Sequence, residues 1–335
     1  MAYTTIDYPE AYFQVKTYTG NGSDDHAITF DGTTNMSPNM VWIKDRERSG
    51  YNHCLIDSVR GVTKVIRPNL SNVEATISDA LKSFDSDGFT LDDDAGNGEM
   101  NINTETYVAW CWKESVTAGF DIVSYTGNGS NRTISHSLSE EPHWMLFKSR
   151  SDAYSWVSYT KTYGNNSVLA LNSTGANDSG VGSSYFNSTN PTSSVFSLGT
   201  AANMNGSSKT FIAYLFAPKQ GFSKFSRYYG NGNASGTTVF CGFTPAFVLI
   251  KSTASGVWRM WDNKRDRLNP NTANFQASAS DAEYDDASVS IDFLSSGFKL
   301  RATDSSFNGN GTAYVYAAFA EAPFVNSNGV PCNAR

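Results

Sequence analysis

The chain has 335 residues and a net charge of −7, and its basic residues are scattered along its length. This distribution excludes the concentrated Lys and Arg of a nucleic-acid-binding face, and no apolar run approaches the roughly 18 residues that span a bilayer. Aromatic residues make up 13% of the chain and charged residues only 17%, and 27 residues are Gly. This balance is typical of β-strands joined by tight turns.

Residues 1–9 form a short arm that lacks the basic and apolar regions of a signal peptide, so we expect synthesis in a cytoplasm. A repeat then opens with Tyr-Thr-Gly-Asn-Gly at 18–22 and 125–129, and with Tyr-Gly-Asn-Gly at 229–232, one residue shorter. Gly and Asn tolerate a positive φ, so each of these segments predicts a hairpin turn.

A second signature follows at 38–44, 142–148 and 245–251. Each copy starts with Pro, continues as a nearly uninterrupted apolar run and ends with Lys44, Lys148 or Lys251. Such a run predicts a strand that is buried on both faces. The lysine at its end is expected to reach water. An aromatic-rich strand closes each repeat, at 107–112, 211–216 and 314–319.

A turn followed by a strand is predicted at 86–91 and 295–300, and 194–198 takes that place in the middle copy without the glycine. The best candidate for a helix is 73–84, which would form about three turns at most. The widely spaced cysteines 54, 111, 241 and 332 form no zinc motif, and we expect them to be reduced, with Cys111 packed in a core strand.

The signatures keep a constant order, and their lysines are 104 and 103 residues apart, which predicts three tandem copies of one module. We place the modules at 10–115, 118–217 and 220–323, followed by a tail at 324–335. The segments between them are too short for free linkers, so neighbouring modules should touch. About a hundred residues with many short strands predict an all-β fold of three β-sandwiches. We favour lectin-like jelly rolls, and immunoglobulin-like sandwiches stay open.

The first module contains Val-Trp-Ile-Lys-Asp-Arg at 41–46, Asp-Ser-Val-Arg-Gly at 57–61, and two further stretches at 83–91 and 107–113. This series resembles a family of bacteriophage virion-associated domains, common in marine and cyanobacterial phages and described mostly as tail-fibre or structural proteins. The resemblance covers nearly the whole chain and implies a part of a virion. The later modules lack the stretch at 57–61, so any special role of that stretch is expected in the first module alone.

An acidic cluster offers one candidate metal site. Asp85, Asp87, Asp92 and Asp94 could supply oxygen ligands to Ca²⁺, but their spacing differs from that of an EF-hand loop. The matching turn of the third module has Ser295 in place of an acid. We therefore favour a solvated hairpin without a metal.

Aromatic side chains offer a candidate sugar-binding surface, because an aromatic face stacks on the apolar face of a pyranose. The candidates follow the lysine-terminated strands by a few residues and are Tyr154, Trp156, Trp258 and Trp261. The alternative is that they begin the next core strand. The four histidines show no metal-binding or catalytic spacing, and we expect them at the surface or in turns.

We expect no catalytic residues and no cofactor. The leading hypothesis is a structural and adhesive virion protein, a tail-fibre or receptor-binding component that contacts host surface glycans. A capsid decoration or spike protein bound to the coat shell is the alternative, and a polysaccharide depolymerase is the third. Other virion proteins would be its partners, and a homotrimer is expected from the analogy with phage fibres.

Overall fold

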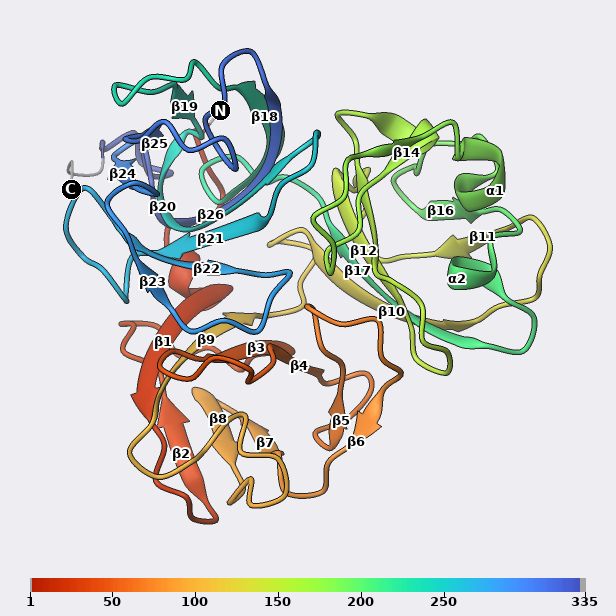
Figure 1. The fold of residues 1–335 in the computed structure, drawn as a ribbon, viewed down its shortest axis with the longest axis horizontal. Helices are drawn as coiled ribbons and strands as arrows, with labels where there is room; N and C mark the ends of the chain where they lie inside the picture. The colour runs from red at the N-terminus through yellow and green to blue at the C-terminus, as the bar shows by residue number, and fades with distance from the viewer. Residues whose placement is uncertain (1, 332–335) are drawn as a thin grey trace.

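The computed structural model describes residues 2–331, and this part of the chain is almost entirely β-structure, which confirms the predicted all-β fold. Three groups of strands surround a common centre (Figure 1). The helical segments of the described residues are short: η1 (Pro9–Ala11), η2 (Gly164–Asn166), α1 (Gly182–Phe186) and α2 (Ala202–Asn205). None of these helices is long and apolar enough to cross a membrane.

One antiparallel strand order recurs three times: β1-β9-β3-β4, then β10-β17-β12-β13, then β18-β26-β20-β21, which β22 and β23 extend. The bounds are β1 Phe13–Thr19, β9 Thr106–Trp112, β3 Met40–Asp45 and β4 Cys54–Asp57; β10 Phe120–Thr126, β17 Thr210–Phe216, β12 Trp144–Ser149 and β13 Val157–Thr160; and β18 Ser223–Tyr229, β26 Ala313–Pro323, β20 Phe243–Ser252, β21 Trp258–Asp262, β22 Ala273–Gln276 and β23 Tyr284–Asp285. We refer to β1–β9, β10–β17 and β18–β26, with their loops, as units 1, 2 and 3. The recurrence supports the proposal of three related modules.

A smaller sheet covers one face of each large sheet. These smaller sheets are β2-β8-β7, β11-β16 and β19-β25-β24, and units 1 and 2 also have the short pairs β5-β6 and β14-β15. Their bounds are β2 His26–Thr29, β8 Gly88–Leu91, β7 Leu81–Asp85, β5 Lys64–Val65 and β6 Ala75–Thr76; β11 Arg132–Ser135, β16 Val195–Leu198, β14 Ser167–Val168 and β15 Asp178–Ser179; and β19 Thr238–Phe240, β25 Gly297–Leu300 and β24 Ile291–Leu294. In unit 1, Val41 of the large sheet and Phe89 of the small sheet share one buried cluster.

The sequence had predicted hairpin turns at the Gly-Asn-Gly segments, and this prediction is wrong. Each connects strands of two different sheets, because β1 pairs with β9 whereas β2 pairs with β8. A Cβ on Gly20 would lie 2.2 Å from the carbonyl oxygen of Ile102, so this close approach requires glycine. The strand register also places Tyr228, rather than Tyr229, in the position of Tyr18, so the third copy is not one residue shorter.

A buried asparagine holds each of these segments in place. The side-chain oxygens of Asn101, Asn205 and Asn308 accept the backbone N–H of the Asn in the Gly-Asn-Gly segment, each at 3.0 Å. The hydroxyl of the signature tyrosine donates to the carbonyl immediately before the buried asparagine, as Tyr125 does to Met204 at 2.8 Å. The repeated Tyr and Gly-Asn-Gly therefore form one structural device that joins the two sheets.

The candidate helix at 73–84 is wrong, because β6 and the first part of β7 occupy this segment. Strand β7 forms a hairpin with β8, and a Cβ on Gly88 would lie 2.0 Å from the carbonyl oxygen of Ile28. Cross-strand pairing has overridden a weak helical pattern here. In unit 2, β16 pairs with β11 as β8 pairs with β2, so 194–198 takes the predicted place.

The predicted burial of the Pro-led strands on both faces is confirmed. Along β3, Val41 and Ile43 point into the core of unit 1, whereas Met40 and Trp42 point into a second core shared by all three units. In the middle of this shared core, Trp112, Phe216 and Phe319 make mutual ring contacts, with centroids 5.6 to 6.5 Å apart. The three units therefore close into a ring around one aromatic centre.

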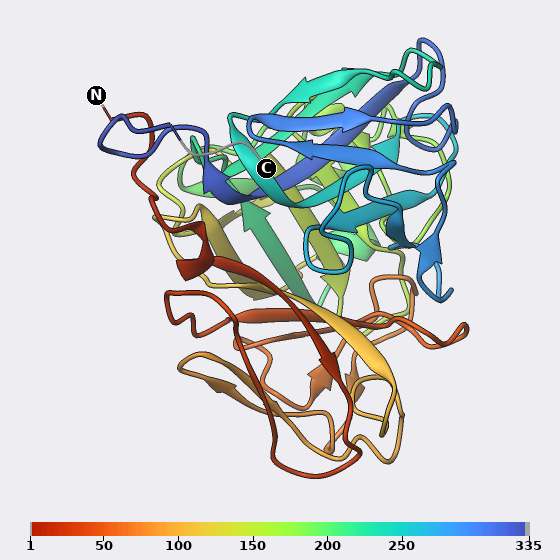
Figure 2. The same ribbon diagram turned by 90° about the vertical axis from the view of Figure 1, so that its left-hand side faces the viewer.

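The two chain ends lie together beside unit 3. Ser327 donates its backbone N–H to Asp7 at 2.7 Å, and the rings of Tyr3 and Phe324 are 6.4 Å apart. Figure 2 shows the N-terminal segment projecting from the body beside the last described loop. Cys332 and the rest of the tail at 332–335 lie outside the described residues, whereas Cys111 is buried in β9 as predicted.

Candidate functional site

Three of the four candidate sugar-binding aromatics are in the core. Trp156, Trp258 and Trp261 are 0 to 2% exposed, so the expectation of a surface role for them is wrong and the core-strand alternative holds. Tyr154 is 39% exposed and remains available to a sugar ring. Trp261 packs against Phe307 within unit 3, with ring centroids 5.5 Å apart.

The four candidate calcium ligands do not come together. Asp85 accepts hydrogen bonds from Ser83 and Thr90, and Asp87 accepts one from the backbone of Met36. Asp94 is fully buried and accepts the backbone N–H of Met100, and burial raises its pKa to about 6.

A different acidic group does form in unit 1. Asp24, Asp92 and Asp93 bring one carboxylate oxygen each within 4.8 Å of one another, at an exposed edge of the unit. Asp24 is exposed and the other two are half-buried. Ca²⁺ takes six to eight oxygen ligands, so these three carboxylates do not by themselves make a site.

The buried tryptophans instead connect neighbouring units. The ring nitrogens of Trp156 in unit 2 and Trp258 in unit 3 donate to backbone carbonyls of the preceding unit, at 3.0 and 2.9 Å. His53 occupies the matching position of unit 1, and its Nε2 lies 3.1 Å from a carbonyl of unit 3. The acceptors are the carbonyls of Arg67, Ala170 and Gln276. Each unit therefore contacts the next in the same sense, which closes a ring.

His53 is buried, which corrects the expectation that the histidines lie at the surface or in turns. Its Nδ1 accepts the indole N–H of Trp42 at 2.9 Å, so Nε2 carries the proton that bonds unit 3. Burial keeps the pKa of this imidazole well below its usual value, and Lys44 nearby lowers it further. The side chain is thus a neutral structural link.

The interface between units 1 and 2 contains a buried charged network. Arg60 donates to Asp57 at 2.5 Å, and both side chains are fully buried. The Tyr214 hydroxyl of unit 2 donates to the same carboxylate at 2.6 Å. Arg150 of unit 2 forms two hydrogen bonds with Glu74, at 2.8 and 2.9 Å, and Arg60 approaches Glu74 at 3.3 Å.

The interface between units 3 and 1 repeats this network with the same geometry. Arg265 donates to Asp262 at 2.6 Å, and the Trp110 indole of unit 1 donates to Asp262 at 3.0 Å. Arg46 of unit 1 forms two hydrogen bonds of 2.9 Å with Glu283, which Arg265 also approaches at 3.1 Å. Bidentate pairs of this kind fix orientation as well as adding attraction.

The interface between units 2 and 3 has uncharged residues at all of these positions. By strand register, Ala317 replaces Trp110 and Tyr214, and Thr160 replaces the two aspartates. Tyr163 takes the place of the buried arginines, and Asn177 and Thr253 take the places of the Glu–Arg pair. The backbone bond persists: Asn177 N–H donates to the Thr253 carbonyl at 2.9 Å.

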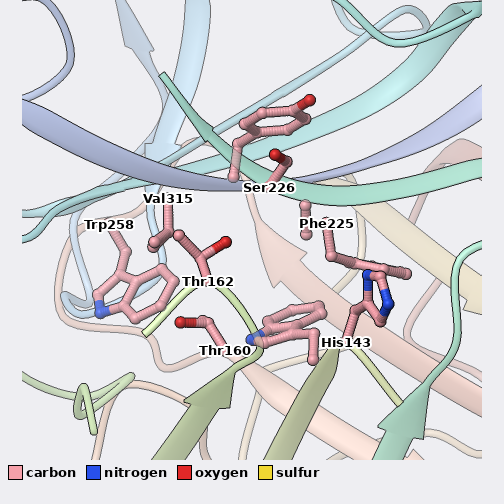
Figure 3. Close-up of a pocket in the computed structure, with 10 residues that line it drawn as sticks. His143, Thr160, Thr162, Phe225, Ser226, Trp258 and Val315 are labelled. Carbon is pink, nitrogen blue, oxygen red and sulfur yellow. The ribbon is translucent and has the colours of Figure 1, made fainter. Parts of the chain in front are cut away.

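A cavity lies at this third interface, where the ring of Trp110 or Tyr214 would be (Figure 3). Its walls include Thr160 and His143 of unit 2 and Ala317, Phe225 and Trp258 of unit 3. The volume is about 10 Å³, which is enough for about one water molecule. Burial lowers the pKa of His143 in this wall.

The signature lysines do not return their strands to water, which corrects another expectation. Lys44, Lys148 and Lys251 are fully buried, and each ammonium donates to the carbonyl of the following residue at 2.7 to 2.8 Å. Burial lowers the pKa of each to about 8. Two of these ammonium groups also contact a neighbouring unit: Lys251 donates to the carbonyl of Gly175 in unit 2, and Lys44 lies over the ring of Phe275 in unit 3.

The Arg–Glu pairs keep their carboxylates charged at neutral pH. Burial would raise the pKa of Glu74, but Arg150 and Arg60 outweigh it and hold this pKa below its usual value. Arg46 and Arg265 have the same net effect on the pKa of Glu283. Both networks are therefore intact at neutral pH.

A family model described as "Domain of unknown function (DUF7483)" matches residues 8–323. The chain belongs to this DUF7483 family. One match spans all three units, so the family corresponds to the closed ring rather than to a single sandwich. No curated protein matches the chain.

Sequence reasoning missed the inter-unit networks. It had expected any role of the stretch at 57–61 only in the first module, but the Asp57–Arg60 pair recurs as Asp262–Arg265. The recurring signal is Asp as the last residue of the fourth strand in the sheet order, followed by Arg three residues later. This pattern was hidden because the residues between them differ.

Proposed function

We propose that this protein is a structural component of a bacteriophage particle, acting in a tail fibre or receptor-binding part rather than as an enzyme. The resemblance of its signatures to phage virion domains supports the location. The observation that carries the mechanical role is the ring of three units, in which buried charged networks join the units at two of the three interfaces. The charged pairs fix the relative orientation of the units at these two interfaces.

The outer loops are where such a head would meet a host glycan. Tyr154 is the exposed member of the candidate aromatics, and binding energy would be spread over several weak contacts. Replacing Tyr154 by Ala in the particle would then reduce adsorption to host cells and leave unfolding unchanged. Unchanged adsorption would remove Tyr154 from the proposed surface.

Cryo-electron microscopy of the particle that carries this chain tests the proposal. Density at the tail, in multiples of three or six, supports a fibre or receptor-binding part and the expected homotrimer. Hundreds of copies over the capsid lattice would replace this proposal by a decoration protein. Cleavage of host envelope polysaccharide by the purified chain would overturn the non-enzymatic role.

A further inference from the structure

We propose that the ring has one designated joint, the interface between units 2 and 3, where these two units move apart while each stays attached to unit 1. This inference concerns the conformational behaviour of the chain and does not depend on the proposed virion role. It rests on a comparison that the molecule contains within itself. Three interfaces share one backbone arrangement, and their side chains differ at matched positions.

Packing is the first argument. At the other two interfaces an aromatic ring crosses between units, as Trp110 does to Asp262 and Tyr214 does to Asp57. Ala317 has no ring to offer at that position, and a small cavity remains beside it. Phe225 of unit 3 still packs against Trp144 and Phe216 of unit 2, with ring centroids 5.9 and 5.8 Å apart, so the interface lacks one crossing ring rather than all aromatic contact.

The cavity is too small to be a binding site for a ligand. Phe225 and Trp144 line the cavity, and its volume of about 10 Å³ holds about one water molecule. A ligand of the size of a sugar or an indole would enter only after units 2 and 3 had separated. The cavity is therefore better explained as a weakly packed joint.

Charge is the second argument. Asn177 and Thr253 use their side chains within their own units, with Ser167 and with the carbonyl of Ala313. Contacts without an ion pair cross this interface: Trp258 donates to Ala170 and Lys251 to Gly175, each at 2.9 Å. The Arg227 guanidinium also lies over the ring of Tyr163, 6.0 Å from its centroid. The bidentate Arg–Glu pairs that fix the relative orientation of the other units have no counterpart here.

Connectivity is the third argument. Residues 217–222 connect units 2 and 3 directly. The two units therefore stay covalently joined when the interface between them opens. The interface between units 3 and 1 joins distant parts of the sequence, and there the charged network is complete. Opening between units 2 and 3 would expose the aromatic walls formed by Trp144, Phe225 and Trp258.

Hydrogen exchange at three matched amides tests the proposal in the unmodified full chain. The N–H groups of Glu74, Asn177 and Glu283 donate to the equivalent carbonyls of Arg150, Thr253 and Arg46, at 3.0, 2.9 and 2.8 Å. We expect the protection factor at Asn177 to be at least about tenfold lower than at the other two. Equal or higher protection at Asn177 would overturn the joint.

Two double variants complete the experiment. In N177E/T253R the missing pair is installed, and protection at residue 177 should rise to that of Glu74. In E74N/R150T the pair between units 1 and 2 is removed, and protection at residue 74 should fall at least about tenfold while Glu283 is unchanged. If residue 74 keeps its protection, the side chains do not control the opening and the proposal fails.

Discussion

The interface between units 1 and 2 and the interface between units 2 and 3 share a backbone arrangement and differ in chemistry. Both have an indole N–H that donates to a carbonyl of the neighbouring unit, and both have the same inter-unit backbone bond. Only the first adds a buried aspartate, two arginines, a glutamate and an aromatic hydroxyl. Backbone geometry can therefore be kept by neutral hydrogen bonds, and the charged groups are an addition to it.

The comparison also shows what a buried ion pair does. Because both partners lose hydration, such a pair is weak evidence of net stability, but removing one partner leaves the other charged and buried. We therefore expect the two charged interfaces to be intolerant of single substitutions. The interface between units 2 and 3 contains no buried ion pair among its matched positions, and we expect it to tolerate substitution better.

The largest expected effect comes from removing the ring of Trp110, which occupies in unit 1 the position of Ala317 in unit 3. Trp110→Ala should lower the free energy of unfolding by about 4 kcal/mol, because it leaves a cavity and removes the hydrogen bond to Asp262. Ala317→Gly, at the matched position, should cost about 1 kcal/mol. Denaturant titration measures both, and equal losses would show that the interfaces do not differ in packing.

The second effect is a broken buried pair. Arg60→Met should lower the free energy of unfolding by about 3 kcal/mol, since Asp57 stays buried without its guanidinium. Tyr163→Phe, the matched change at the neutral interface, should stay within about 0.5 kcal/mol. A loss below 1 kcal/mol for Arg60→Met would mean that water reaches Asp57 and that the network is not structural.

The third effect concerns the buried lysine that each unit contains, which is Lys44, Lys148 or Lys251. Burial lowers the pKa of Lys148 to about 8 from 10.5, so between these values the unfolded chain binds more protons and stability rises with pH. From pH 7.5 to pH 10 the free energy of unfolding of the native chain should rise by about 2 kcal/mol more than that of Lys148→Met. Lys161→Met, at the surface, should give parallel curves, and parallel curves for Lys148→Met would refute the burial of its charge.

The smallest expected effect is a loss of folding stability at acidic pH that arises only from the charged interfaces. The pKa of Glu74 is lowered, so its contribution is present above the unfolded value near 4.5 and is lost as the pH falls below it. Glu74→Gln should cost about 1 kcal/mol at pH 7 and almost nothing at pH 3. Asn177→Gln should show no such pH dependence, and a similar slope for both variants would break the distinction between the interfaces.

Several parts of the fold were visible in the sequence because their signals are local. The nearly continuous apolar runs such as 40–43 correctly predicted strands buried on both faces, and the repeated order of signatures matches the repeated strand order. Glycines at 20 and 88 mark places where two backbones come too close for a side chain. Each of these features depends on neighbouring residues or on one short-range clash.

The assignments that failed depend on what covers a residue from another unit. Lys44 ends an apolar strand and was expected to reach water, and Trp156 was a candidate surface aromatic, but both are buried and contact a neighbouring unit. The Asp57–Arg60 pair reads as a local motif until Tyr214 and Arg150 of unit 2 approach it. The sequence by itself determined the long buried strands and their repetition, because the hydrophobic pattern acts within a unit, but it did not determine which sheets the Gly-Asn-Gly segments connect. Only the tertiary structure decided that the units close into a ring and which interface lacks charge, because burial and ion pairing across units depend on contacts between residues up to about 240 positions apart.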